Sequence, residues 1–266
     1  MVSTEACGED EDMACSYTAA SVERESNQDR PGRPGTDLVQ PLGYTAPIFF
    51  RAPIMARATH GEATRQNIIL TALELYAEHG LDGVSLRTIS AESGTRNSAA
   101  AHYHFGSRLG VLEAVVTFIT DFTRPQFESG FQSLEADPAP SLRDVVKAMT
   151  TPYLSLTLSP DWGPAALRFM AHLHADNTPD VVQLMNAHFR PDVERIETQL
   201  HRVLPHIPRD VLRVRLAFTF VSLIHGAAEI DMLSNTPFGD IRPDDRTLFT
   251  YFVDFVEGGL AFSPPA

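Results

Sequence analysis

The sequence predicts an all-α protein in which a small N-terminal helical unit is followed by a larger helical domain. From Glu62 to Phe262, apolar residues recur at spacings of three and four, the period of one face of a helix. Loops that contain Gly or Pro separate these periodic segments. The sequence has no alternating segment of convincing length and no Asn-Gly hairpin, so we expect no β-sheet.

Residues 1–58 differ in composition from the rest of the chain. They are rich in Glu, Asp, Ser, Pro and Gly, as in EACGEDED and RPGRPG, and show no sustained period. Such a segment buries too little apolar surface to offset the entropy of ordering it, which predicts a disordered acidic tail. An alternative is that translation begins at Met55, just before a basic stretch.

The composition indicates a cytoplasmic protein that does not enter a membrane. No uninterrupted apolar run approaches the roughly 18 residues that span a bilayer, and the N-terminus does not resemble an export signal. The two cysteines, Cys7 and Cys15, are too few for a disulfide framework or a four-ligand metal site. The net charge of −13 argues against a generally basic surface, although residues 56–124 are nearly balanced, with six Arg against seven acidic residues.

Four helices are expected in the N-terminal unit. The first begins near Glu62 and ends at Gly80, and Ser85 caps a short second helix that ends at Gly94. A third short helix is expected over residues 98–104. Ser107 caps a longer fourth helix, which Pro125 is expected to break or bend.

Five further periodic segments form the larger domain. They cover residues 141–158, 162–175, 179–204, 209–233 and 244–262. Pro152 and Pro191 fall inside two of them and predict kinks.

Two short helices joined by a tight turn that contains Gly describe a helix-turn-helix, whose second helix enters the DNA major groove. The run TRQNIILTALELYAEHGLDGVSLRTISAESGTRNSAAAHYHFGSRLGVLEAV, from residue 64, resembles the N-terminal domain of the TetR family of transcriptional regulators. The resemblance implies a helix-turn-helix DNA-binding domain over residues 59–107 and an effector-binding and dimerisation domain over residues 108–266. It implies a homodimeric, ligand-responsive repressor that binds a palindromic DNA operator, with neither a cofactor nor a catalytic residue.

The recognition segment departs from the family pattern in two ways. The turn after Gly94 is one residue longer, as in a subgroup whose motif reads like RNxSAxxYHFGSR, and His102 stands where a phosphate-contacting Tyr is frequent. Arg and Asn are the side chains best suited to guanine and adenine edges, so Arg96 and Asn97 are expected to read bases at the helix entrance. The remaining expected DNA-binding residues position the domain on the backbone or line the groove: Ser85, Arg87, Thr95, Ser98, His102, Tyr103 and Arg108.

Aromatic residues, methionines and histidines between residues 162 and 189 suit the lining of a small-molecule pocket. The expected ligand-binding residues are Trp162, Phe169, Met170, His172, His174 and Phe189, beside Met185 and His188. The last two long helices carry more apolar surface than one monomer is expected to bury, so we expect them to form the dimer interface. Their interface candidates are Phe218, Val221, Leu223, Ile224, Ala227, Ala228, Ile230, Leu248, Phe252, Phe255 and Val256.

Two alternatives remain open from the sequence. One is a helical metal-dependent enzyme that uses His172, His174 and His188, although no HExxH motif or third ligand at a recognisable spacing supports it. The other is an interaction protein whose helix-turn-helix has lost DNA binding, which the acidic net charge favours.

Overall fold

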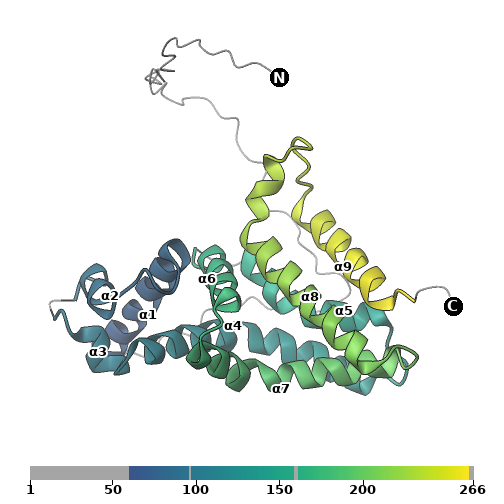
Figure 1. The fold of residues 1–266 in the computed structure, drawn as a ribbon, viewed down its shortest axis with the longest axis horizontal. Coiled ribbons are helices and arrows are strands. Elements are labelled where there is room, and N and C mark those ends of the chain that lie inside the picture. Colours follow the sequence, from purple (N-terminus) through teal and green to yellow (C-terminus); the bar gives the residue numbers. More distant parts are fainter. Residues whose placement is uncertain (1–59, 96, 159–160, 264–266) are drawn as a thin grey trace, which may run out of the picture. The chain divides into compact units, whose positions relative to one another are not determined.

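A computed structural model of the chain describes residues 60–95, 97–158 and 161–263, which fold as helices joined by loops (Figure 1). The tail expected over residues 1–58 lies outside the described residues, as does Arg96. Within them no strand forms, and a single isolated bridge joins Thr236 to Gly239. The predicted all-α class is confirmed.

The first four helices are α1 (His60–His79), α2 (Leu86–Glu92), α3 (Ala100–Phe105) and α4 (Arg108–Ala136). Both predicted caps are confirmed, because Ser85 Oγ accepts from the Thr88 N–H at 3.1 Å and Ser107 Oγ accepts from the Gly110 N–H at 3.0 Å. The third helix begins at Ala100, two residues later than predicted. A turn closed by the Ala100 N–H on the Asn97 carbonyl, at 3.0 Å, occupies the preceding residues.

The larger domain contains α5 (Leu142–Leu154), α6 (Gly163–Ala175), α7 (Pro179–Val203), α8 (Arg209–Ala228) and α9 (Asp245–Ala261). Two predicted helices are shorter than expected. The segment 141–158 ends as a 3-10 turn, η1 (Ser155–Leu158), and the segment 209–233 divides at Glu229 into α8 and the 3-10 turn η2 (Ile230–Ser234). Pro152 and Pro191 lie inside α5 and α7, and the kinks expected at them stay a prediction.

Pro125, which was expected to break or bend the fourth helix, does not break it, since α4 continues through it to Ala136. Proline has no backbone N–H, so α4 lacks one helical hydrogen bond at Pro125, and side-chain packing explains why the helix continues. Beyond the proline, Phe127 and Phe131 are buried with their rings stacked at 4.3 Å, and Leu134 is buried one turn later. These contacts hold the second half of α4 in the core.

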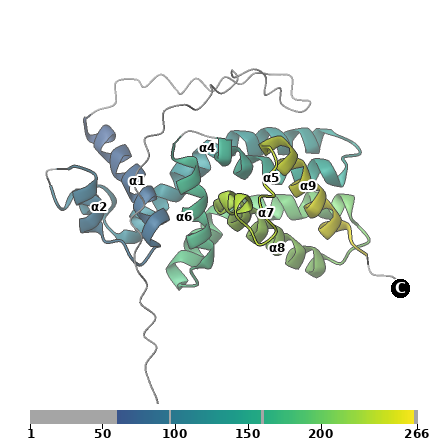
Figure 2. The same ribbon diagram turned by 90° about the horizontal axis from the view of Figure 1, so that it is seen from above.

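Two clusters of buried side chains make up the core. One joins α1–α3 and the first half of α4 to α6 and to the adjoining ends of α7 and α8. The other joins the second half of α4 to α5, α9 and the remaining halves of α7 and α8. Helix α6 contacts both α1 and α8, and Figure 2 shows it between them. The helical unit at the N-terminus therefore shares its core with the larger domain.

Candidate DNA-binding surface and ligand pocket

A buried serine fixes the crossing of α2 and α3. Ser90 is fully buried, its hydroxyl donates to the Leu86 carbonyl at 2.9 Å, and it accepts from the Ala101 N–H at 3.0 Å. Gly94, with φ +67°, supplies the left-handed residue in the turn between the helices. At the C-terminal end of α2, Asn67 of α1 donates to the Ser93 carbonyl at 2.6 Å. The two short helices are thus held in one geometry by side chains as well as by packing.

Most of the expected DNA-binding residues lie at the surface of this unit. The Tyr103 ring is 82% exposed, a high value for an aromatic side chain. No ion pair joins Arg87 to a described residue. Thr95 is half-buried, and its hydroxyl donates to the Ser90 carbonyl at 2.8 Å, so it stabilises the turn. The expected residues that are exposed are Ser85, Arg87, Asn97, Ser98, His102 and Tyr103.

Asn97 has a local structural role at the approach to α3. Its Oδ1 accepts from the Ala99 N–H at 3.0 Å, which satisfies a backbone donor before the helix begins. A bidentate contact to adenine needs both the oxygen and the nitrogen of the amide. Reading a base in that way would require Asn97 to give up its bond to Ala99. Arg96, the other expected base reader, lies outside the described residues.

Arg108, expected to contact phosphate, is instead paired within the protein. Its Nη2 lies 2.9 Å from Asp82 Oδ1, which ties the start of α4 to the loop between α1 and α2. Burial raises the pKa of Tyr76 on α1, and the charge of nearby Arg108 opposes that shift. Arg108 therefore links the start of α4 to the loop after α1 within the N-terminal helical unit. Because its side chain is still 41% exposed, the structure leaves it able to reach an anion.

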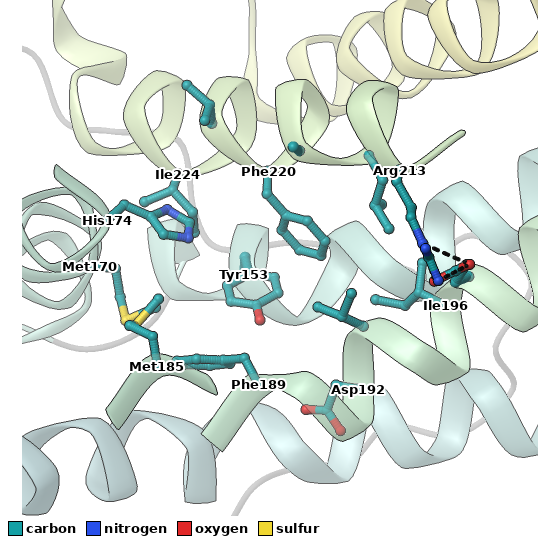
Figure 3. Close-up of a pocket in the computed structure, with 15 residues that line it drawn as sticks. Tyr153, Met170, His174, Met185, Phe189, Asp192, Ile196, Arg213, Phe220 and Ile224 are labelled. Carbon is teal, nitrogen blue, oxygen red and sulfur yellow. Dashed lines mark hydrogen bonds and ion pairs between the residues drawn. The ribbon is translucent and has the colours of Figure 1, made fainter. Parts of the chain in front are cut away.

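A cavity of about 470 Å³ lies in the larger domain between α5, α6, α7 and α8 (Figure 3). This volume is within the range of small-molecule sites, and most of the wall is apolar. The aromatic part of the wall comes from Tyr153, Phe189 and Phe220, and the Tyr153 and Phe220 rings meet edge to face at 6.0 Å. Met170 and Met185 add unbranched, adaptable side chains.

The polar groups of the cavity wall are few. Burial raises the pKa of the Tyr153 hydroxyl, and Asp192 raises it further, so the hydroxyl remains a donor. Burial also lowers the pKa of His174, assisted by His225, and His174 Nδ1 is buried without a hydrogen-bond partner among the described residues. Glu197 is neutralised by Arg213, whose Nε donates to its two oxygens at 3.0 and 3.1 Å.

Three of the six expected ligand-binding residues line this cavity, namely Met170, His174 and Phe189. The other three do not. Phe169 is fully buried against Tyr76, with ring centroids 6.0 Å apart. Trp162 packs against Phe118 and Phe122 at 4.7 and 5.0 Å. His172 is exposed on α6.

Wall residues on three helices were not predicted from the sequence, and two of these helices, α5 and α8, held no expected ligand-binding residue. Tyr153 comes from α5, Asp192 from α7 and Phe220 from α8. The one available signal was the position of Tyr153 directly after Pro152, within an apolar segment. No sequence pattern indicated that Asp192 and Phe220 line a pocket, because only the packing of α7 and α8 brings them to one cavity.

The metal-dependent alternative required His172, His174 and His188 to converge with a further ligand. Among the described residues, no three His, Cys, Asp or Glu side chains are grouped as a metal site needs. The structure thus gives this alternative no support.

Helices α8 and α9 present an exposed apolar surface, which we call the α8–α9 face. Helix α8 is apolar and long enough to span a membrane by length and composition, but Leu212, Leu216 and Leu223 are buried in the protein core. Leu223, Ile224, Ala227 and Val256, expected at the interface, are likewise buried within the monomer. The α8–α9 face consists of Val214, Phe218, Val221, Tyr251 and Phe255, which are between 51% and 68% exposed.

Comparison with known families gives two matches along the chain. Residues 68–115 match the family described as "Bacterial regulatory proteins, tetR family". Residues 147–259 match the family described as "Tetracyclin repressor-like, C-terminal domain". The first match covers α2, α3 and parts of α1 and α4, and the second covers the cavity and the α8–α9 face.

Similar individual proteins agree with these matches. The uncharacterized HTH-type transcriptional regulator TtgW of Pseudomonas putida is 41% identical over 64 residues, which are 23% of this chain. The chain spans about half of that relative, 47% of its length. The structure titled SmeT-Triclosan complex is 19% identical, with a TM-score of 0.52, over 77% of this chain and 99% of that one. A HlyIIR mutant protein is 16% identical, with a TM-score of 0.51, over 76% of this chain and 100% of that one. At these identities the two structures bear on the fold.

Proposed function

The chain carries the N-terminal and C-terminal domains of the TetR family, and we propose that it is a DNA-binding transcriptional regulator. In this proposal it is a homodimeric, ligand-responsive repressor in the cytoplasm, without catalytic activity. The observation that carries the proposal is the rigid α2–α3 pair, which Ser90 ties together while Arg87, His102 and Tyr103 remain exposed. A fixed short helix with exposed polar side chains is what groove recognition needs.

We propose that the segment from Arg96 to Arg108 acts as a recognition segment of the RNxSAxxYHFGSR-like subgroup. Tyr103 and Arg87 would contact phosphates, and His102 would face the groove. Arg96 is the preferred candidate for reading a base, because Asn97 Oδ1 is already bonded to the Ala99 N–H. The main role of Arg108 would be to position α4 through its bond to Asp82, and contact with a phosphate would be an additional role.

The cavity between α5 and α8 is the proposed effector site, and helix α6 connects it to the DNA-binding unit. Met170 and His174 of α6 line the cavity, whereas Phe169 of the same helix packs on Tyr76 of α1. A molecule that changes the position of α6 therefore changes a contact with α1. SmeT, a protein of the same fold, has been solved in complex with triclosan. An effector that favours one arrangement of the two α1–α3 units would shift the population of dimers that fit an operator.

DNA binding is tested by fluorescence polarisation with the full-length protein and the DNA that flanks its own gene. We expect specific binding that weakens steeply with salt, since phosphate contacts release counterions. His102→Ala should reduce affinity for this DNA. The matched control is His206→Ala, an exposed histidine on the loop after α7, which should leave affinity unchanged.

The same measurement separates this proposal from an interaction protein without DNA binding. Absence of salt-sensitive binding to the flanking DNA, at protein concentrations that preserve the dimer, would overturn the proposed function. Equal losses in the two histidine variants would contradict the role of α3.

A further inference from the structure

The wall of the cavity carries unbalanced negative charge at Asp192, on α7. Asp192 Oδ1 accepts from Arg124 Nη1 at 3.4 Å, close to the limit of a hydrogen bond, and no described residue donates to its Oδ2. Glu197, the other carboxylate of the wall, has both oxygens bonded to Arg213. Asp192 is thus the wall carboxylate with free acceptor capacity.

The surrounding ion pairs do not neutralise Asp192. Arg124 also lies 3.9 Å from Glu128, so it is shared between two carboxylates. Arg195 is paired with Glu128 at 2.8 Å and with Glu135 at 2.7 Å. In this network three carboxylates, Asp192, Glu128 and Glu135, share two guanidinium groups and leave one negative charge in excess. Asp192 is the member of the network that reaches the cavity.

The rest of the wall suits an aromatic body beside that charge. Figure 3 shows Phe189, Tyr153 and Phe220 grouped in the part of the cavity near Asp192, with His174 at the other end. Aromatic faces attract cations, and the attraction grows where water is excluded. Burial opposes ionisation of Asp192 and raises its pKa. A cationic partner therefore stabilises this desolvated carboxylate more than it would stabilise an exposed one. An anion would have to be desolvated next to the same carboxylate.

We propose that the cavity selects lipophilic aromatic amines in their protonated form, with the ammonium group held by Asp192. The aromatic body lies against Tyr153, Phe189 and Phe220, and Arg124 keeps Glu128 as its partner when the amine binds. This inference rests on the proposed function only for the statement that the cavity is the effector site. Binding by the cavity itself can be measured without DNA.

Three probes of the same size and different charge test the proposal at neutral pH: naphthylethylamine, naphthylethanol and naphthylacetate. Isothermal titration calorimetry on the full-length protein should give an affinity for the amine about ten- to a hundredfold higher than for the alcohol, the range of a hydrogen bond to a charged group. The acid should bind most weakly. Asp192→Asn should abolish the preference of amine over alcohol while it preserves the affinity for the alcohol.

Glu194→Gln is the matched control, because it removes a carboxylate that lies on the same helix but is exposed outside the cavity wall. It should leave the preference for the amine unchanged. Equal or better binding of the alcohol or the acid, a preference that survives Asp192→Asn, or no binding of any probe would each overturn the inference. Polarisation with the flanking DNA is measured in parallel. If the protein binds the operator but shows no preference for the amine, this inference is overturned and the proposed function stands. If it prefers the amine but does not bind the operator, the proposed function is overturned and this inference stands.

Discussion

At the scale of single residues, side-chain hydrogen bonds act over two ranges, within one turn of a helix and between segments far apart in the chain. Ser85 and Ser107 could be predicted as helix caps, because a cap depends on the next three residues of the chain. The contact between Arg108 and Asp82 could not, because those residues are 26 positions apart. The bond from Asn97 to the Ala99 N–H lies within one turn, but it was hidden because the start of α3 was predicted two residues early.

Ser90 should contribute to stability well beyond what a small side chain suggests. Ser90→Ala removes the acceptor of the Ala101 N–H, which is buried, and an unsatisfied buried donor costs about 1–3 kcal/mol. We expect the free energy of unfolding, measured by urea titration, to fall by that amount. Ser133→Ala is the control, because Ser133 is exposed on α4 and its hydroxyl donates only to the Ser129 carbonyl. Equal losses in both variants would show that the bond across the two helices is not the cause.

His174 should make the protein less stable in acid. Its pKa is lowered in the folded protein, by burial and then by His225, so the unfolded chain binds the proton more readily. Stability then decreases as pH falls below the unfolded value, about 6.5. We expect the wild type to lose more unfolding free energy than His174→Gln between about pH 7.5 and pH 5.5 in urea titrations. The same loss in both proteins would assign the acid sensitivity to other groups.

At the scale of helices, the sequence predicted which segments are helical better than it predicted where each helix ends or what each of its faces contacts. All nine predicted helical segments correspond to helices of the structure, whereas the continuation of α4 through Pro125 depends on packing partners on other elements. The same limit applied to the cavity. Phe169 and Met170 are neighbours in sequence, yet one faces Tyr76 and the other faces the cavity. The positions of α1 and α8 determine which of the two side chains faces the cavity.

The crossing of α4 and α5 should depend on Gly130. A Cβ atom at this position would lie 3.2 Å from Ala148 Cβ and 3.3 Å from its Cα, which is tighter than ordinary contact, so Gly130→Ala requires Ala148 to move. The overlap costs about 1–3 kcal/mol, more than the roughly 0.5–1 kcal/mol that alanine gains in a helix. We therefore expect a net loss of unfolding free energy in urea titration.

A second substitution distinguishes overlap from helix propensity. Ala148→Gly removes the nearer of the two atoms that the new Cβ would meet, so the Gly130→Ala, Ala148→Gly double variant should be more stable than the sum of the single changes predicts, by about 1 kcal/mol. Additive effects would rule out a direct contact between the two positions.

At the scale of the whole molecule, two features of the surface fit a dimer that binds DNA despite its net charge of −13. Some acidic residues of the larger domain are neutralised by ion pairs. Arg195 of α7, for example, pairs with Glu128 and Glu135 of α4. The α8–α9 face is, by contrast, apolar over Val214, Phe218, Val221, Tyr251 and Phe255. Exposed apolar patches of this kind mark association sites on soluble proteins.

Phe218 should decide the oligomeric state, because it is the most exposed residue of the α8–α9 face, at 68%, and it belongs to no part of the cavity wall. Phe218→Asp places a charge where a second copy would bury apolar surface, and we expect a monomer by analytical ultracentrifugation at micromolar concentration. Phe238→Asp is the matched control, since Phe238 is 85% exposed outside this face. A monomer cannot engage two half-sites at once, so Phe218→Asp should also lose most of its affinity for the flanking DNA while its thermal unfolding in isolation remains cooperative. A Phe218→Asp protein that stays dimeric would move the interface away from α8, and a monomer that keeps full DNA affinity would separate dimerisation from DNA recognition.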